Sequence, residues 1–444
     1  MEREPNVALH RHMREATWSD KGTARRVNDE RLRRGRPTGY GGANVRGWLR
    51  GVVPDPLTRE ILAFLLSDAL ARRVTPVDLG FAAPENPRIG LVWNEDIAIT
   101  LDEVSTLWRE PDPDSYPLAH GAYTGPTRDW LLAWPEQWPE KLPQSTKSVT
   151  RAEVETLWTA CETYQAMERR LGAGHFRTTI ATLLTDVVTP MLRRPSSEKT
   201  GRTVLAVAAR LTDILGYAAY DGLDDGLAQR YFIQSLRLAR ASGDDALAAH
   251  IFGDMARHAI HIGDLREALA LTRAGQHAAR SGGSPADQAR NACLEAKVLA
   301  MLDMRRESAN AMSAAERSLS TVDLASAPAW VRYFTVEEMH DEFAHISAAA
   351  GRHADVLTFA VTPMSGGSKL ERRTALLATA VARAHLGLGA IDEASAVTST
   401  VLDLSRGMSS RRVAREVRTL CDAVATLLPA PAAADLVQRR VLAG

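Results

Sequence analysis

The sequence predicts an all-α protein in three parts: a basic head over residues 1–81, a Trp- and Pro-rich connector over residues 82–149, and a long array of helical hairpins over residues 150–444. Ala, Leu and Arg, which have the highest helix propensities, recur along the chain, whereas aromatic side chains make up only 6% of it. Beyond residue 150, Gly, Pro and Asp divide the apolar periodicity into stretches of about 20 residues, the length of single helices. A chain of 444 residues is also too long for one hydrophobic core.

Four segments of the head have apolar residues at helical spacing. Leu9 and Met13 mark the first, and Ser19 is suited to cap the second, which starts over residues 23–28. A third helix over residues 43–51 ends at a glycine, and a fourth follows Pro54. One face of the third helix is apolar, with Val45, Trp48 and Leu49, and the other is small or basic, with Ala43, Arg46, Gly47 and Arg50, and with Asn44 at its edge.

Charge is unevenly distributed along the chain. Residues 1–51 hold twelve Lys and Arg against six Asp and Glu, a net charge of +6, and the whole chain has a formal net charge of zero, so the remainder is acidic. A basic head on an acidic body is suited to approach a polyanion with one end. The alternative interpretation is that the Arg-rich segments merely reflect a genome rich in G and C.

The head resembles the Xre/Cro type of helix-turn-helix domain found in actinobacterial transcriptional regulators. The resemblance rests on Trp-Leu-Arg-Gly-Val-Val-Pro at residues 48–54 and Thr-Pro-Val-Asp-Leu-Gly at residues 75–80. It implies five helices, the third of which lies in the major groove of double-stranded DNA. The spacing from Ala24 to Val45 is about twice that of the simple motif, so residues 29–41 are an insertion that lengthens the second helix and adds a basic loop.

Residue types in the head then predict how DNA is contacted. Arg46 can fork onto guanine and Asn44 onto adenine, and the small Ala43 and Gly47 allow the helix to lie close to the bases. Phosphate contacts are expected from Arg25, Arg26 and Arg50, and the inserted basic loop, in which Arg34 and Arg36 lie, is expected to contact the DNA backbone as well. The alternative is that the insertion has spoiled the motif and the head is a docking domain without affinity for DNA.

The connector is expected to pack against another part of the protein. It holds nine prolines, which exclude a long helix, and five tryptophans, which a flexible linker would not carry. Within it, Ile89 to Val92 could form a short strand, and Thr100 to Arg109 a helix that starts at a threonine cap.

The array repeats. Thr150 and Glu153 form a capping box at its start, and a second-helix pattern recurs at Gly226–Ala239, Leu265–Leu271, Arg306–Met312, His353–Leu357 and Ile391–Val397. A recurrence near 40 residues indicates a solenoid of helix pairs. Over roughly residues 150 to 430 the array resembles tetratricopeptide repeats, although its period is longer than the usual 34 and the early Trp and final Pro positions of that family are not matched.

No catalytic, cofactor or metal motif is found, and the three cysteines are far apart and expected to be buried and reduced. We therefore expect a cytoplasmic, homodimeric transcriptional regulator without a membrane span, whose array senses a small molecule, a peptide or a protein partner. Four aromatic residues could line the groove of the array, or could be inter-helix packing: Tyr217, Tyr220, Tyr231 and Phe232. The alternative function is a protein-interaction scaffold with a docking head.

Overall fold

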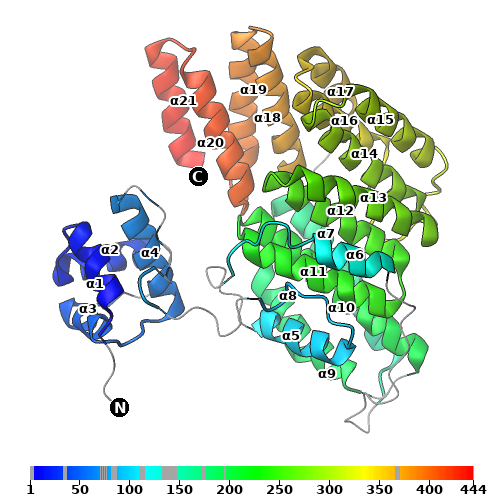
Figure 1. The fold of residues 1–444 in the computed structure, drawn as a ribbon. Helices are drawn as coiled ribbons and strands as arrows, with labels where there is room; N and C mark the ends of the chain where they lie inside the picture. Colours follow the sequence, from blue (N-terminus) through cyan, green and yellow to red (C-terminus); the bar gives the residue numbers. More distant parts are fainter. Residues whose placement is uncertain are drawn as a thin grey trace. The chain divides into compact units, whose positions relative to one another are not determined.

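Apolar residues at helical spacing make this chain all-helical. The computed structural model describes residues 5–33, 38–70, 72, 74, 76, 78–81, 88–109, 116–132, 148–172, 176–194, 197–365 and 371–443, and no strand occurs within these ranges. Residues 1–88 with 112–117 form one unit, and residues 89–111 with 118–444 form a second (Figure 1).

The first unit holds α1 (Val7–Glu15), α2 (Asp20–Arg33), α3 (Gly42–Leu49) and α4 (Pro56–Leu70). Leu9 and Met13 of α1 pack with Val27 of α2, with Val45 and Trp48 of α3 and with the inner face of α4. The Asn6 side chain caps α1 by accepting a hydrogen bond from the backbone N–H of Leu9 at 2.9 Å.

The expected fifth helix of the head is absent from the described residues. The backbone N–H groups of Leu79 and Phe81 both donate to the carbonyl of Pro76, which makes a tight turn. Gly80 has φ of +74°, and a Cβ there would lie 2.6 Å from the Asn6 Oδ1 atom, so the turn packs directly against the start of α1. Leu79 and Phe81 are buried in the core, which shows that the segment closes the unit without being helical.

The connector folds onto the second unit through α5 (Ile97–Arg109) and α6 (Thr124–Leu132). Ile89 to Val92 forms turns and not a strand, because the side chains of Arg230 and Gln234 bond its carbonyl groups. The helix α5 begins before the expected Thr100, which is buried inside it. Asp96 provides the first-turn contact by accepting a hydrogen bond from Ala98 N–H at 2.8 Å.

Aromatic side chains fix the connector to the array. The indole N–H of Trp108 donates to Thr212 Oγ1 at 3.2 Å, and the Tyr123 hydroxyl lies 2.7 Å from Nδ1 of His258. Trp130 packs edge-to-face on Phe252. These three aromatic residues are buried, so the segment forms part of the second unit and does not behave as a free linker.

The rest of the second unit is a series of helices. The bounds are α7 (Arg151–Leu171), α8 (Arg177–Leu183), a π-helical turn Leu184–Val188, α9 (Thr189–Leu192), α10 (Glu198–Asp221), α11 (Asp225–Ser242), α12 (Asp245–His261), α13 (Leu265–Ser281), α14 (Pro285–Met301), α15 (Arg305–Leu319), α16 (Val336–Ala349), α17 (His353–Ser365), α18 (Glu371–Gly387), α19 (Ile391–Ser405), α20 (Arg411–Ala425) and α21 (Ala430–Ala443).

From α10 onward, consecutive helices pack as hairpins, which follow one another from green to red in Figure 1. The first helix of each hairpin also packs on the first helix of the next, through α10, α12, α14, α16, α18 and α20. The second helices α11, α13, α15, α17 and α19 contain the repeated segments that the sequence singled out. Repeat-like packing is therefore confirmed for the described part of the array.

The array closes on itself, because α10 also packs on α20. The fully buried Asp221, at the end of α10, is bonded by Arg372 of α18 at 3.0 Å and lies 3.4 Å from Nε of Arg412 of α20. Beside this cluster, the N–H of Ser409 donates to the carbonyl of Leu171 at 3.1 Å, which joins the end of α7 to the start of the last hairpin. The first helices of the hairpins therefore surround a common interior.

Replacing Trp108 with alanine should destabilise the second unit by about 3–5 kcal/mol, since it removes a buried indole and the hydrogen bond that the indole N–H donates to Thr212. Urea unfolding followed by circular dichroism measures the change. The exposed Leu132→Ala, at the end of α6, is the matched control and should shift stability by no more than about 0.5 kcal/mol. Equal effects of the two variants would show that the connector does not contribute to the fold.

Candidate functional site

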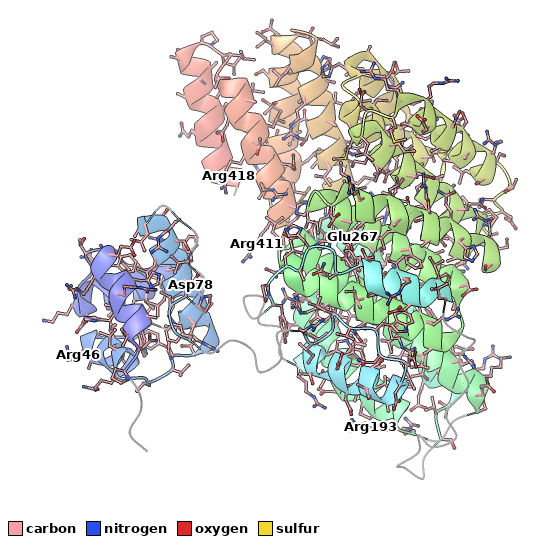
Figure 2. The ribbon with its side chains drawn as sticks, in the orientation of Figure 1. Arg46, Asp78, Arg193, Glu267, Arg411 and Arg418 are labelled. Carbon is pink, nitrogen blue, oxygen red and sulfur yellow. The ribbon has the colours of Figure 1, made fainter. Side chains whose placement is uncertain are left out.

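The first candidate site is the outer face of α3. Val45 and Trp48 anchor the helix in the core, while Ala43, Asn44, Arg46 and Arg50 are exposed and Gly47 is half-buried. Arg46 points away from the head in Figure 2. The helix ends at Gly51, whose φ of +87° is the left-handed conformation that favours glycine. One helix thus presents a small, polar and basic surface.

A network of polar side chains holds α3 against α2 and α4. The Asn28 side chain donates to the carbonyl of Tyr40 at 2.8 Å and accepts hydrogen bonds from the N–H groups of Gly39 and Tyr40. The Tyr40 hydroxyl donates to Asp55, and its ring packs edge-to-face on Trp48. Although burial alone would raise it, hydrogen bonds from Thr58 and Tyr40 lower the pKa of Asp55 to about 2. The start of α3 is therefore fixed despite the inserted loop.

Two polar side chains on the surface of α3 already have contacts within the head. Arg46 lies 3.8 Å from Asp20, in the first turn of α2, and 55% of its side chain remains exposed. The Asn44 Oδ1 atom accepts a hydrogen bond from the N–H of Gly41 at 2.9 Å, which completes the cap of α3. The side chain expected to read adenine therefore also has a structural role. These contacts leave the Arg46 guanidinium partly accessible.

The other expected DNA contacts lie on α2 or outside the described residues. Arg25 is exposed and lies 3.9 Å from Asp29, and Arg26 stacks over the Trp18 ring at 4.7 Å from its centroid. Arg34 and Arg36 fall in residues 34–37, which the structure does not describe. Lys21 was not predicted as a DNA contact. It is exposed and lies beside the start of α3, since its Cγ would be 3.3 Å from a Cβ at Gly42. Its position one turn before Arg25 on α2 was the available signal.

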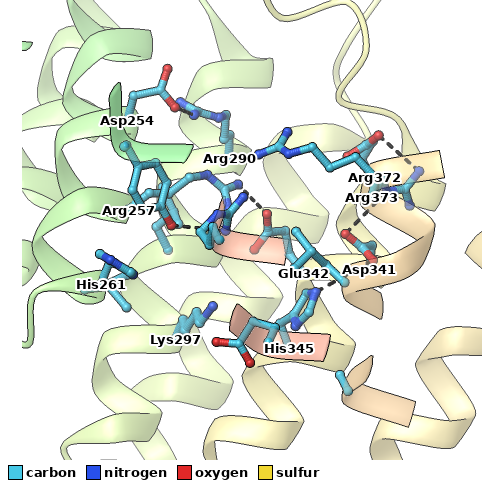
Figure 3. A pocket seen from close by; sticks show the side chains of 18 of the residues that line it. Asp254, Arg257, His261, Arg290, Lys297, Asp341, Glu342, His345, Arg372 and Arg373 are labelled. Carbon is cyan, nitrogen blue, oxygen red and sulfur yellow. Dashed lines mark hydrogen bonds and ion pairs between the residues drawn. The ribbon is translucent and has the colours of Figure 1, made fainter. Parts of the chain in front are cut away.

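The second candidate site is the interior of the array, a cavity of about 910 Å³ (Figure 3). The first helices of the hairpins line it, and the end of α7 contributes Gln165, Glu168 and Arg169. A volume of this size lies within the range of pockets for small ligands. The wall is unusually rich in charge, with arginines on α7, α10, α12, α14, α18 and α20 and carboxylates on α7, α12, α16 and α20.

Most of these charges are paired across neighbouring helices. Arg257 of α12 bonds Glu342 of α16, Arg373 of α18 lies 3.3 Å from Asp341, and Arg372 donates to Glu168 at 2.6 Å. Burial alone would raise the pKa of Glu342, but the guanidinium of Arg257 and the ammonium of Lys297 lower it to about 2. The pairs join helices that are distant in sequence and maintain the shape of the cavity.

Three buried residues, two of them in the wall of the cavity, approach the arrangement of a metal site. Ligand atoms of Asp213, His250 and Asp254 lie within 4.8 Å of one another. Arg210 already bonds Asp213, and Arg290 already bonds Asp254, so the cations of the protein compensate both carboxylates. Burial together with the nearby Asp254 raises the pKa of Asp213 to about 8, which also disfavours the ionised ligand that a metal needs. The cluster is consistent with a buried polar network.

The four aromatic residues expected to line the groove separate into two pairs. Tyr217 and Tyr220 lie in the cavity wall, where Arg372 stacks over Tyr217 and Arg412 over Tyr220. Tyr231 and Phe232 are fully buried in α11. Tyr231 donates its hydroxyl hydrogen to the Leu107 carbonyl at 3.0 Å, and Phe232 packs against Gly216. The second pair therefore serves the packing between helices and does not face the cavity.

Sequence reasoning did not identify Lys297 and His345, which lie in the cavity wall on α14 and α16. Lys297 is the one charged residue within the apolar run Ala296–Leu302, which was the available signal. A lysine on the inward face of a helix must either be paired or face a cavity.

Comparison with known families gives one match in the head. Residues 9–82 match the model of the SP15 N-terminal domain. No curated protein matches the chain. Within the described residues, no helix is both long and apolar enough to cross a membrane.

Replacing His345 with glutamine should flatten the pH dependence of stability between pH 7 and pH 5. Burial, with Lys297 adding to its effect, lowers the pKa of His345 to about 3. The unfolded chain takes up this proton near pH 6.5, so the neutral imidazole stabilises the fold above that pH and the contribution is lost as pH falls. Its loss at pH 5 is about 2 kcal/mol.

Urea unfolding at pH 7 and at pH 5 measures this difference. The imidazole faces Lys297 of α14, Arg257 of α12, Arg412 of α20, and Asp341 and Glu342 of its own helix. If wild type and His345→Gln lose equal stability between pH 7 and pH 5, protonation of His345 does not contribute to the pH dependence of stability.

Proposed function

We propose that this protein is a sequence-specific DNA-binding transcriptional regulator whose helical array senses a ligand or partner and mediates dimerisation. The observation that carries the proposal is the exposed basic face of α3. Arg46 and Arg50 lie on its outside beside the small Ala43 and Gly47, while Val45 and Trp48 fix the helix from within. Such a helix can enter the major groove with its polar side facing base edges.

The resemblance of the head to Xre/Cro-type domains supports the same function. The chain departs from that pattern in two ways: the segment between α2 and α3 is long, and the described residues after α4 make turns. The first departure is compensated by Asn28, which ties the loop to α2. A single head offers a small contact area, so binding as a homodimer to two half-sites is part of the proposal.

The array supplies the sensing part of the proposal. It resembles tetratricopeptide repeats in its hairpins, and the inner helices enclose a cavity large enough for a small molecule. Occupation of the cavity would stabilise one arrangement of the hairpins and thereby bias the DNA-binding state. A reducing, cytoplasmic location accords with three buried cysteines that are not joined in disulfides.

DNA binding is tested with the full-length protein. Genomic fragments are first selected for binding at low salt, and the affinity of a selected duplex is then measured across a salt series. Affinity should fall steeply with salt, since counterions are released from the phosphates. Arg46→Ala combined with Arg50→Ala should weaken binding at least about tenfold, because it removes a base contact and a phosphate contact.

The matched control removes two exposed arginines from the second unit, Arg151→Ala with Arg305→Ala, and should bind like wild type. Failure to select any fragment at low salt would support the alternative, a scaffold whose head is a docking module. An equal loss in both double variants would show that binding depends on overall charge and not on α3.

Replacing Asp20 with asparagine should strengthen binding to the same duplex severalfold. Asp20 lies beside Arg46 and adds negative charge next to the surface that meets the phosphates. Asp29→Asn, farther along α2 beside Arg25, is the control for removing one carboxylate and should have a smaller effect. Unchanged affinity of Asp20→Asn would contradict the placement of this edge of α3 against DNA.

A further inference from the structure

The lining of the cavity is most charged at the starts of its helices, and apolar residues are more frequent toward their ends. Along α16, Glu338, Asp341 and Glu342 come first, His345 follows, and Ala348 and Ala349 come last. On α14, Arg290 comes first, Leu294 and Lys297 follow, and Met301 comes last. On α18, Arg372 and Arg373 are followed by Leu376, Thr379 and Ala380, and then by Arg383 and Ala384. The helix α16 packs on both α14 and α18, so the three sets form one wall.

Lys297 lies where the charged and apolar parts of α14 meet. Among the described residues it has no hydrogen-bond or ion-pair partner, and Figure 3 shows it without the dashed lines that connect the surrounding arginines to carboxylates. Glu342, the carboxylate that acts most on it, is already bonded by Arg257. Burial lowers the pKa of Lys297, although the nearby carboxylate of Glu342 acts to raise it.

The charges near Lys297 do not balance. The charged groups that act most on Lys297 are the cations Arg257 and Arg412 and the carboxylates Glu342 and Asp341, so that with Lys297 itself three cations face two carboxylates. Burial lowers the pKa of His345 to about 3, so its imidazole is neutral near pH 7 and does not change this balance. One further negative group would satisfy Lys297 and neutralise this part of the wall.

We propose that the cavity binds a small amphiphilic acid, whose anionic head pairs with Lys297 and whose apolar body lies against the ends of α14 and α16 and the middle of α18. The head is a carboxylate or a phosphate monoester, and the body contacts Leu294, Met301, Ala348, Leu376 and Ala380. The binding itself is independent of DNA, and only the role of the acid as an effector rests on the proposed function.

Isothermal titration of the full-length protein with simple probes tests this site. The probes are octanoate, octyl phosphate, 1-octanol and acetate, each titrated in the absence of DNA. Octanoate or octyl phosphate should bind at one site per chain and at least about tenfold more tightly than octanol or acetate, since only they offer both a charge and an apolar body. The tighter of the two anions identifies the head group.

Lys297→Met keeps an apolar stem of similar length and should weaken the bound anion at least about tenfold while leaving octanol unaffected. Lys199→Met, which removes an exposed lysine of α10, is the matched control and should bind like wild type. Circular dichroism at the titration temperature establishes that both variants are folded.

The proposal is overturned if none of the probes binds stoichiometrically, if octanol binds as well as the anions, or if Lys297→Met retains wild-type affinity for them. Binding of the anions together with an absence of DNA binding would leave this site standing and reject the regulator. The reverse result would reject only the site.

Discussion

The buried pairing of Asp221 with Arg372 and Arg412 is the constraint on which the second unit depends. Asp221 ends α10, the first inner helix, and its partners begin α18 and α20, which come last in the array. Burial alone would raise the pKa of Asp221, but the two guanidinium groups hold it below its ordinary value. Separating the helices would leave a buried charge uncompensated, at a cost of about 3–5 kcal/mol. These pairs hold the end of α10 against α18 and α20, and all three helices line the cavity.

The two units use polar residues in different ways. In the head, the hydrogen bonds between Asn28 and Tyr40 fix the start of α3. The residues proposed to contact DNA lie on the exposed side of that helix. In the second unit the buried polar residues themselves form the candidate site. Most charged side chains in its wall are paired with a side chain of opposite charge on a neighbouring helix. Lys297 differs from the paired arginines around it, because its ammonium has no ion-pair partner among the described residues.

The all-helical class, the recurring second helices and the turns between them could be predicted from the sequence, because they follow from local periodicity and from Gly and Asp at helix ends. The prediction of a strand at Ile89 was wrong because of tertiary contacts. Arg230 and Gln234, more than 100 residues away, donate hydrogen bonds to the carbonyl groups of this segment and hold it in turns. The same limit applies to the cavity. Tyr217 and Tyr231 look alike in sequence, and only the packing of α11 against the connector decides that one faces the interior and the other is buried.

The packing of the connector has a consequence for how the chain is made. The hydrogen-bond partner of Trp108, Thr212, is synthesised 104 residues after it, and the partner of Tyr123, His258, is synthesised 135 residues after it. A ribosome therefore releases a head that can fold at once, followed by a segment whose aromatic side chains stay uncovered until α12 has emerged. Nascent chains that stall between these points would expose indole and phenol rings while already carrying a finished basic domain. Such fragments would be prone to aggregate until the rings were covered.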